Sequence, residues 1–195
     1  HSSPDISQIN VVPTGYTTTV YDRDGNAIEN LIGAEANRVY VSLSELPKRV
    51  SNAFISVEDE RFYEHNGIDL KGILRAAYVG ITNGRFSEGA STITQQLIKN
   101  NVLQGGYETS MADKLRRKIQ EQFLAVKLED QLDSKETILE YYLNTINLGG
   151  NCLGVQTAAH RYFGKNVWEL TLSECTVLAA TTSNPSRYNP LTHPK

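Results

Sequence analysis

The chain has 195 residues, of which 39% are hydrophobic and 21% are charged, and its formal net charge is −3. This length and composition fit a globular domain with a full hydrophobic core and exclude a disordered or fibrous class. Because the net charge is close to zero, we expect no nucleic-acid partner, and local clusters of Lys and Arg must hold any anionic ligand.

The N-terminal part of the chain shows little helical periodicity. Residues 17–21 favour a strand and residues 22–26 a turn, which together predict a small hairpin or an extended linker. We therefore expect residues 1–42 to form an N-terminal β or extended segment, and residues 43–195 to form the catalytic domain. The sequence has no apolar run of the roughly 18 residues that a membrane-spanning helix needs, and we expect a membrane anchor to precede the given residues.

Beyond Ser44, apolar residues at spacings of three and four predict a nearly all-helical domain. Helices are expected over residues 47–64, 69 to about 78 or 80, 91 to about 103, 111–130, 134–149, 155–163 and from 171 onward. Residues 81–90 are rich in Gly, Asn and Ser and predict a mobile loop, and a second break is expected at residues 104–107.

Capping residues mark the starts of several of these helices. Asp69 and Ser134 are suitable single caps, while Thr92 with Gln95 and residues 171–174 have the spacing of a capping box. In the helix over residues 111–130, an apolar series falls on one face and consists of Leu115, Ile119, Phe123 and Val126.

The first candidate site lies in residues 58–67. On the predicted helix, Glu58 falls on the same stripe as Ile55 and Phe62, and a carboxylate beside apolar surface is a candidate general base or acid. Solvated charges near a helix end, with His65 as a partner of the helix dipole, explain the same residues. For a segment taken alone, this second interpretation is the more frequent one.

Two further segments carry polar and basic residues at helical spacing. Thr92, Gln96 and Lys99 form one polar face after a glycine-containing entry, which suits an anion or sugar hydroxyls but also a plain capped helix facing solvent. Residues 114–121 place four basic residues before Glu121. Arg117 and Glu121 either pair on the helix surface or form a phosphate clamp oriented by a carboxylate.

Other site chemistries find little support in the sequence. The four histidines form no metal-ligand pair at helical spacing, and no Ser precedes a Lys by three residues, as serine acylation would require. Cys152 and Cys175 form neither a disulfide framework nor a zinc motif, so we expect two buried free thiols.

Together these segments resemble the peptidoglycan glycosyltransferases, the module of class A penicillin-binding proteins and of monofunctional transglycosylases. The family's first motif, Glu-Asp-x-x-Phe-x-x-His-x-Gly, is complete in residues 58–67, and its second occupies residues 89–96, with Ala90 at a position where relatives commonly have glycine. The third motif is Arg117, Lys118 and Glu121, and the fourth is residues 138–144. Relatives usually carry an Arg between the second and third motifs, whereas residues 104–113 contain no basic residue.

The resemblance implies a mainly α, lysozyme-like helical head with a smaller mobile jaw that touches the membrane. It implies lipid II and the growing glycan chain as substrates, the outer face of the cytoplasmic membrane as location, and other cell-wall synthesis proteins as candidate partners. Glu58 would be the general base of a single inverting displacement, and Glu121 the second catalytic carboxylate, which orients the basic groups. No metal ligand is implied. Some relatives place a divalent cation, Mg²⁺ or Mn²⁺, on the pyrophosphate, and the sequence leaves this open.

The resemblance also assigns the remaining motif residues. The expected substrate-binding residues are Asp59, Phe62, His65, Ser91, Thr92, Gln95, Gln96, Lys99, Asn100, Arg117 and Lys118. The expected structural residues are Gly67, Gly89, Glu140 and Asn144. Two rival functions remain, a lysozyme-like glycan hydrolase or lytic enzyme and a non-catalytic cell-wall scaffold. A hydrolase has no need of a basic clamp, and intact Glu58 and Glu121 argue against a degenerate scaffold.

Overall fold

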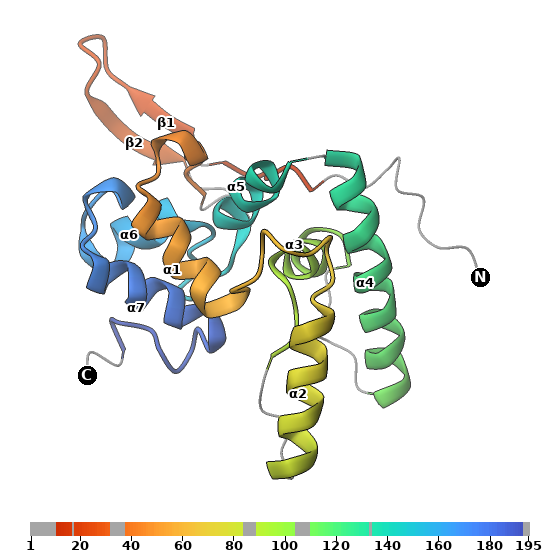
Figure 1. Cartoon of the computed structure of the whole chain (residues 1–195). Coiled ribbons are helices and arrows are strands. Elements are labelled where there is room, and N and C mark those ends of the chain that lie inside the picture. Colours follow the sequence, from red (N-terminus) through yellow and green to blue (C-terminus); the bar gives the residue numbers. More distant parts are fainter. Residues whose placement is uncertain are drawn as a thin grey trace. The chain divides into compact units, whose positions relative to one another are not determined.

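The computed structural model describes residues 11–16, 18–31, 38–83, 89–103, 110–132 and 134–192 (Figure 1). Over these residues the chain is mostly helical, with seven α-helices, short 3-10 turns and a two-stranded sheet. The predicted mainly α fold is confirmed. None of the helices in these ranges is long and apolar enough to cross a membrane.

The chain folds as two compact units. One is built mainly of residues 54–142, and the other of residues 12–53 and 143–195. The helices α1 (Lys48–Glu58) and α5 (Lys135–Thr145) each contribute residues to both units. The expected boundary between an N-terminal segment and a catalytic domain at residues 42 and 43 stays a prediction.

The second unit contains the predicted hairpin. Strand β1 (Thr18–Tyr21) pairs antiparallel with β2 (Ala27–Leu31). Asp22 closes the turn by accepting hydrogen bonds from the backbone N–H groups of Asp24 and Asn26, at 2.9 and 2.7 Å. The same unit holds α6 (Val155–Phe163), the 3-10 turns η2 (Leu43–Glu45) and η3 (Val167–Glu169), and α7 (Leu172–Ser183). Cys152 and Cys175 are buried and free, as expected.

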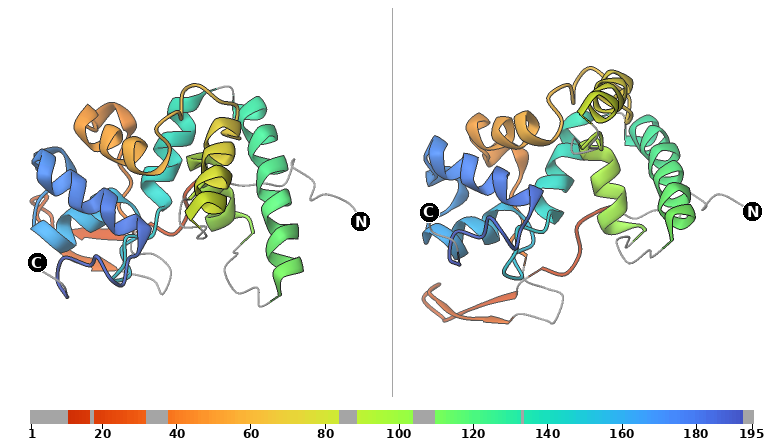
Figure 2. Two further views of the ribbon diagram at one scale, coloured as in Figure 1. Left: turned by 60° about the horizontal axis from the view of Figure 1, so that its bottom comes forward. Right: turned by 90° about the horizontal axis from the view of Figure 1, so that it is seen from below.

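The first unit is organised around α3. Its helices are α2 (Leu70–Asn83), α3 (Ile93–Asn101) and α4 (Met111–Leu132). Ile93, Leu97 and Ile98 of α3 are fully buried, and α4 packs along this helix, as both views of Figure 2 show. α3 therefore packs against the helix that carries the third motif.

Helix α1 ends six residues before its expected end at residue 64. The backbone N–H of Asp59 closes the last turn on Ile55, and residues 60–67 then form turns and bends. The Asp59 carboxylate accepts two hydrogen bonds from beyond the helix, from His65 and from the N–H of Ile93. These bonds satisfy polar groups that a continued helix would have placed elsewhere, so tertiary contacts override the helical periodicity.

The buried face of α4 differs from the apolar face that the sequence suggested. Leu115, Ile119 and Phe123 share one face as predicted, but their exposed fractions are 64%, 58% and 43%. The face turned to the core instead carries Glu121, Leu124, Ala125 and Leu128. The core can accept Glu121 because two neighbouring cations pair with its carboxylate.

The predicted caps are confirmed, with one difference. Asp69 accepts from the N–H of Gly72 at the start of α2, and Ser134 accepts from the N–H of Thr137 at the start of α5. The capping box at residues 171–174 is complete. Thr92 accepts from the N–H of Gln95, but the Gln95 side chain bonds elsewhere, so this box is only half formed.

Two more helices end at residues other than those expected. Both expected loops include residues outside the described ranges. α5 ends at Thr145, before the glycines at 149 and 150, which have positive φ angles of 82° and 57° and form a turn. α2 runs on to Asn83, and residues 84–88 of the expected mobile loop lie outside the described residues. The same holds for residues 104–109 of the second break.

Candidate active site

Glu58 is the last residue of α1 and is half buried. Its Oε2 accepts a hydrogen bond of 2.6 Å from Nε2 of Gln96, on α3. The amide oxygen of Gln96 in turn accepts from the hydroxyl of Tyr142, on α5, at 3.3 Å. A carboxylate that receives a donor in this way is held in a defined orientation, as a general base requires.

A pocket of about 100 Å³ opens beside Glu58. Its lining residues come from the end of α1, the start of α2 and the segment before α3: Ser56, Val57, Glu58, Asp59, Glu60, Arg61, Asp69, Gly72, Arg75, Gly89, Ala90, Ser91 and Thr92. The pocket is therefore polar, with carboxylate groups and guanidinium groups at its edge. Such a lining suits a hydrated, hydroxyl-rich ligand better than an apolar one.

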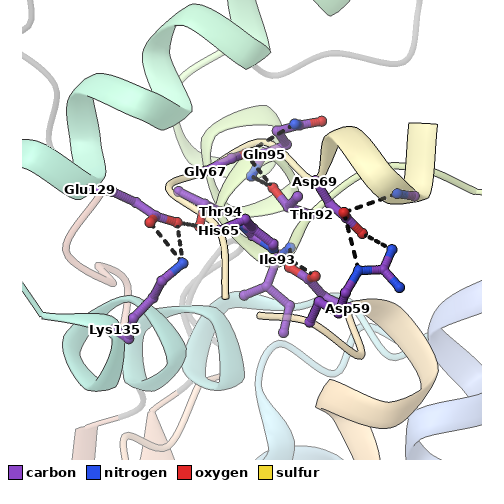
Figure 3. A network of polar contacts seen from close by, with 12 residues as sticks. Asp59, His65, Gly67, Asp69, Thr92, Ile93, Thr94, Gln95, Glu129 and Lys135 are labelled. Carbon is purple, nitrogen blue, oxygen red and sulfur yellow. Dashed lines mark hydrogen bonds and ion pairs between the residues drawn. The ribbon is translucent and has the colours of Figure 1, made fainter. Parts of the chain in front are cut away.

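Asp59 and His65 join the first motif to the start of α3 (Figure 3). The buried Asp59 carboxylate accepts from Nε2 of His65 at 2.8 Å and from the backbone N–H of Ile93 at 2.9 Å. A carboxylate at a helix N-terminus interacts favourably with the helix dipole as well as with the N–H group. The pair thus fixes the turn after Glu58 against the helix that carries Gln96.

Gly67 is held between α3 and α4. Its carbonyl accepts from the hydroxyl of Thr92 at 2.8 Å and from Nε2 of Gln95 at 3.1 Å, and Figure 3 shows both side chains directed at it. Gly67 has a φ of +83°, and a Cβ atom there would lie 2.7 Å from the backbone carbon of Ala125. Glycine is needed at this position for both its φ angle and its close approach to α4.

Arg117, Lys118 and Glu121 form a cluster on α4. The Glu121 carboxylate is only 2% exposed and is paired with Nη1 of Arg117 and, at 3.1 Å, with Nζ of Lys118. Nζ of Lys118 also donates to Ser91 and, at 3.0 Å, to Oε1 of Gln95. Because the side chain of Lys118 is 34% exposed, this cation is both positioned and accessible to a ligand.

A second ion pair borders the pocket. Arg61 pairs with Asp69 at 2.5 Å, and Asp69 also accepts from the N–H of Gly72. Burial by itself raises the pKa of Asp69, but the hydrogen bonds from Arg61 and Gly72 outweigh it and lower this pKa below its ordinary value. The pairing likewise raises the pKa of Arg61, so both groups are charged at neutral pH.

The remaining residues that were expected to bind substrate differ in how deeply they are buried. Phe62 is fully buried and lies edge-on to Tyr63 and His65, so it belongs to the core. Lys99 is half buried in the last turn of α3, and Asn100 is exposed. The expected ligand contacts of these residues stay predictions.

The expected structural residues also occupy different surroundings. Asn144 is buried in the second unit, where it exchanges two hydrogen bonds with the backbone of Val41, at 2.9 and 2.8 Å. It therefore binds an extended segment of the same unit. Glu140 is half buried. Gly89 is exposed, and a Cβ atom at this position would have no described neighbour within 4 Å.

Sequence reasoning missed Tyr142 and the pair formed by Arg61 and Asp69. Tyr142 lies within the fourth motif, which the sequence suggested is structural, and its contact with Gln96 spans 46 residues. Asp69 was recognised only as a helix cap. A Tyr among apolar residues of a helix carries no signal of its hydrogen-bond partner, so sequence alone offers no means of finding this contact.

Metal-binding side chains do not cluster in the part of the chain that the structure describes. Among those residues, no three or more His, Cys, Asp or Glu side chains gather in an arrangement that could hold a metal ion. The polar groups around Glu58 and Glu121 are instead engaged in the ion pairs and hydrogen bonds described above.

Comparison with known proteins identifies similar sequences. The model of a family described as Transglycosylase matches residues 24–195. Penicillin-binding protein 1A of Aquifex aeolicus is 47% identical over 176 residues, which cover 90% of this chain and 23% of that protein. The protein of the same name from Escherichia coli is 45% identical over 188 residues, 96% of this chain and 21% of the relative. That from Clostridium novyi is 42% identical over 193 residues, 97% and 22%. The chain thus spans less than a quarter of these relatives.

Proposed function

The chain belongs to the transglycosylase family, and from this membership we propose that it is a peptidoglycan glycosyltransferase that polymerises lipid II into β-1,4-linked glycan strands. Undecaprenyl pyrophosphate would be the leaving group. Glu58 acts as general base, and the reaction is a single displacement with inversion at the anomeric carbon.

The observation that carries this proposal is the pair of consecutive glutamines on α3. Gln96 bonds to Glu58, while its neighbour Gln95 bonds to Lys118 of the basic cluster. One helix therefore positions both a candidate base and a candidate phosphate-binding cation. A glycan hydrolase uses a carboxylate in a similar way but has no negatively charged leaving group that a cation would need to stabilise.

The proposed reaction needs one base and a stabilised leaving group. The 4-hydroxyl oxygen of the acceptor sugar attacks the anomeric carbon of the donor, and its proton passes to the Glu58 carboxylate. The bond between the anomeric carbon and the pyrophosphate oxygen breaks at the same time. The electron pair of that bond stays on the pyrophosphate, which leaves attached to the lipid.

Positive charge on α3 and α4 stabilises this leaving group. Lys99, Arg117 and Lys118 contribute it, and Glu121 holds the last two in place through its ion pairs. The Arg that relatives usually carry in the preceding loop has no counterpart here, because residues 104–113 contain no basic residue, and Lys114 or Arg116 is the candidate substitute. A divalent cation on the pyrophosphate would add to the same charge. We propose that none is required, which polymerisation in the presence of EDTA tests.

The lipid-linked substrate also requires a membrane surface, and α2 and α4 have suitable apolar stripes. Leu70, Leu74, Tyr78 and Ile81 recur at spacings of three and four on α2 with exposed fractions of 68–75%. On α4, Met111 and Leu115 are 79% and 64% exposed. Figure 1 shows the C-terminal end of α2 and the N-terminal end of α4 at the same end of the unit. Exposed apolar side chains of this kind favour insertion into a membrane interface.

We place this surface on the outer face of the cytoplasmic membrane, where lipid II is polymerised, and other cell-wall synthesis proteins are the candidate partners. The test is incubation of the protein with lipid II in detergent, followed by separation of the products. Glycan polymer and released lipid pyrophosphate are expected. Cleavage of preformed glycan without polymer would support a hydrolase, and binding without either product would support a scaffold.

A further inference from the structure

We propose that Tyr142 is a positioning residue for Glu58. It acts through Gln96: the tyrosine hydroxyl holds the amide oxygen, and the amide nitrogen at the other end of the same group holds the carboxylate. This inference rests on the proposed function, in which Glu58 is the base, and it assigns to Gln96 a role in orienting that base in addition to any contact with substrate.

The surroundings of Tyr142 exclude a direct contact with substrate. Its side chain is fully buried in α5, so the hydroxyl has no access to a ligand in the pocket. Burial raises the pKa of Tyr142 well above its ordinary value, and the nearby carboxylates of Glu58 and Asp59 raise it further. The phenol is therefore neutral throughout the working pH range and keeps the proton that it donates to Gln96.

The chemistry of the three groups determines which atom donates and which accepts in each of the two hydrogen bonds. A carboxylate only accepts hydrogen bonds, so Gln96 must present its Nε2 to Glu58, and the amide oxygen then faces the hydroxyl of Tyr142. The bond from the Tyr142 hydroxyl to Gln96, at 3.3 Å, is much longer than the 2.6 Å bond from Gln96 to Glu58. Tyr142 therefore contributes little binding energy of its own, but it fixes the end of the side chain that determines where Nε2 points.

Loss of this hydroxyl has a consequence that a purely structural role would not have. When the amide of Gln96 is free to rotate, the Glu58 carboxylate loses the donor that fixes its orientation, and fewer enzyme molecules hold the base in a productive position. The rate of the chemical step therefore falls, while substrate binding is little affected.

The test is Tyr142→Phe, which removes one oxygen atom, with Tyr162→Phe as a matched control. Tyr162 is also buried, but it lies in the other unit, where its hydroxyl donates to the backbone carbonyl of Leu148 in that same unit. For Tyr142→Phe we expect kcat to fall about 5–30-fold with KM for lipid II changed less than twofold. The control should leave both kcat and KM within about twofold of the wild-type values.

A double-mutant cycle tests whether Tyr142 acts through Gln96. In the background of Gln96→Met, which keeps the side-chain length without the amide, adding Tyr142→Phe should lower kcat less than twofold further. Independent, multiplying losses would overturn the inference, as would an unchanged kcat in Tyr142→Phe. Should Tyr142→Phe not fold, the kcat of Gln96→Met alone decides, because it must fall when the amide that holds Glu58 is removed.

Failure of this inference is distinguishable from failure of the proposed function. If Glu58→Gln keeps its activity, Glu58 is not the base and the proposed mechanism fails. If Glu58→Gln is inactive while Tyr142→Phe has the kcat of wild type, the mechanism stands and only the positioning role is refuted.

Discussion

Glu58 combines two features that a general base needs, partial burial and a hydrogen bond that orients it. Its replacement by Gln keeps the size of the side chain but removes the proton acceptor. We expect Glu58→Gln to fold normally and to lose about 10²–10⁴-fold in polymerisation rate. Glu64→Gln removes the same charge from an exposed position nearby and should retain activity. A folded Glu58→Gln protein that forms polymer at the wild-type rate would exclude Glu58 as the base.

Replacement of Lys118 tests the proposed phosphate-binding role of the cluster on α4. Replacing it by Met should weaken binding of lipid pyrophosphates, or of the phosphoglycolipid moenomycin, by about 1.5–3 kcal/mol, the worth of one charged hydrogen bond. Binding of an uncharged glycan fragment should barely change. Calorimetry at fixed salt measures both, because screening imitates part of the effect.

The control for this variant is Lys127→Met, which removes an exposed charge elsewhere on α4. It should leave the affinity for both ligands unchanged. Equal weakening of charged and uncharged ligands by Lys118→Met would indicate a folding defect or a plain sugar site, and the electrostatic basis of the proposed transfer would be lost.

Among the structural elements, the contact between Gly67 and α4 allows a matched test. Gly67→Ala and Gly164→Ala both place a side chain at a positive φ, 83° and 64°, which costs about 1–2 kcal/mol. Only at Gly67 would the new Cβ also meet a backbone atom, at 2.7 Å. We therefore expect Gly67→Ala to lower the melting temperature at least twice as much as Gly164→Ala. Equal shifts in melting temperature would show that α4 moves to accommodate the new Cβ atom.

The clasp of Arg61, Asp69 and Gly72 links the first-motif turn to the start of α2. Because the pKa of Asp69 is below its ordinary value in the folded protein, the clasp stabilises the fold above about pH 3.9, the unfolded pKa. That contribution is lost as the pH falls through the folded pKa. Asp69→Asn should therefore lower the free energy of unfolding at pH 7 and lose less of it between pH 4 and 2 than wild type does. Urea unfolding at several pH values measures this, and identical acid losses in both proteins would contradict it.

At the scale of the whole molecule, the apolar stripes of α2 and α4 predict binding to lipid surfaces. Leu74→Glu replaces a side chain that is 71% exposed, and we expect it to weaken binding to vesicles of mixed zwitterionic and anionic lipids about tenfold or more, since burying a Leu is worth roughly 1.5–3 kcal/mol. Leu172→Glu, at a 65% exposed position on α7, should have little effect. Sedimentation with vesicles measures both. Equal effects of the two variants would show that binding is not specific to α2.

Features that depend on neighbouring residues were predictable from the sequence. The hairpin, the caps at Asp69 and Ser134, and the bounds of α6 follow from local hydrogen bonding and from allowed backbone angles. The order of the motifs also predicted the family, which the family match confirms.

Contacts between residues that are distant in the sequence could not be predicted without the folded structure. Periodicity places Glu121 on a helix, but it does not show that this carboxylate enters the core between two cations, or that the apolar stripe of α4 stays exposed. Periodicity also predicted that α1 continues beyond Glu58, whereas the helix ends there and the bonds of Asp59 to His65 and Ile93 hold the following turn. The chain of Tyr142, Gln96 and Glu58 joins residues 38 and 46 positions apart. Such contacts depend on how helices pack against one another, and a pattern that repeats every three or four residues contains no information about that packing.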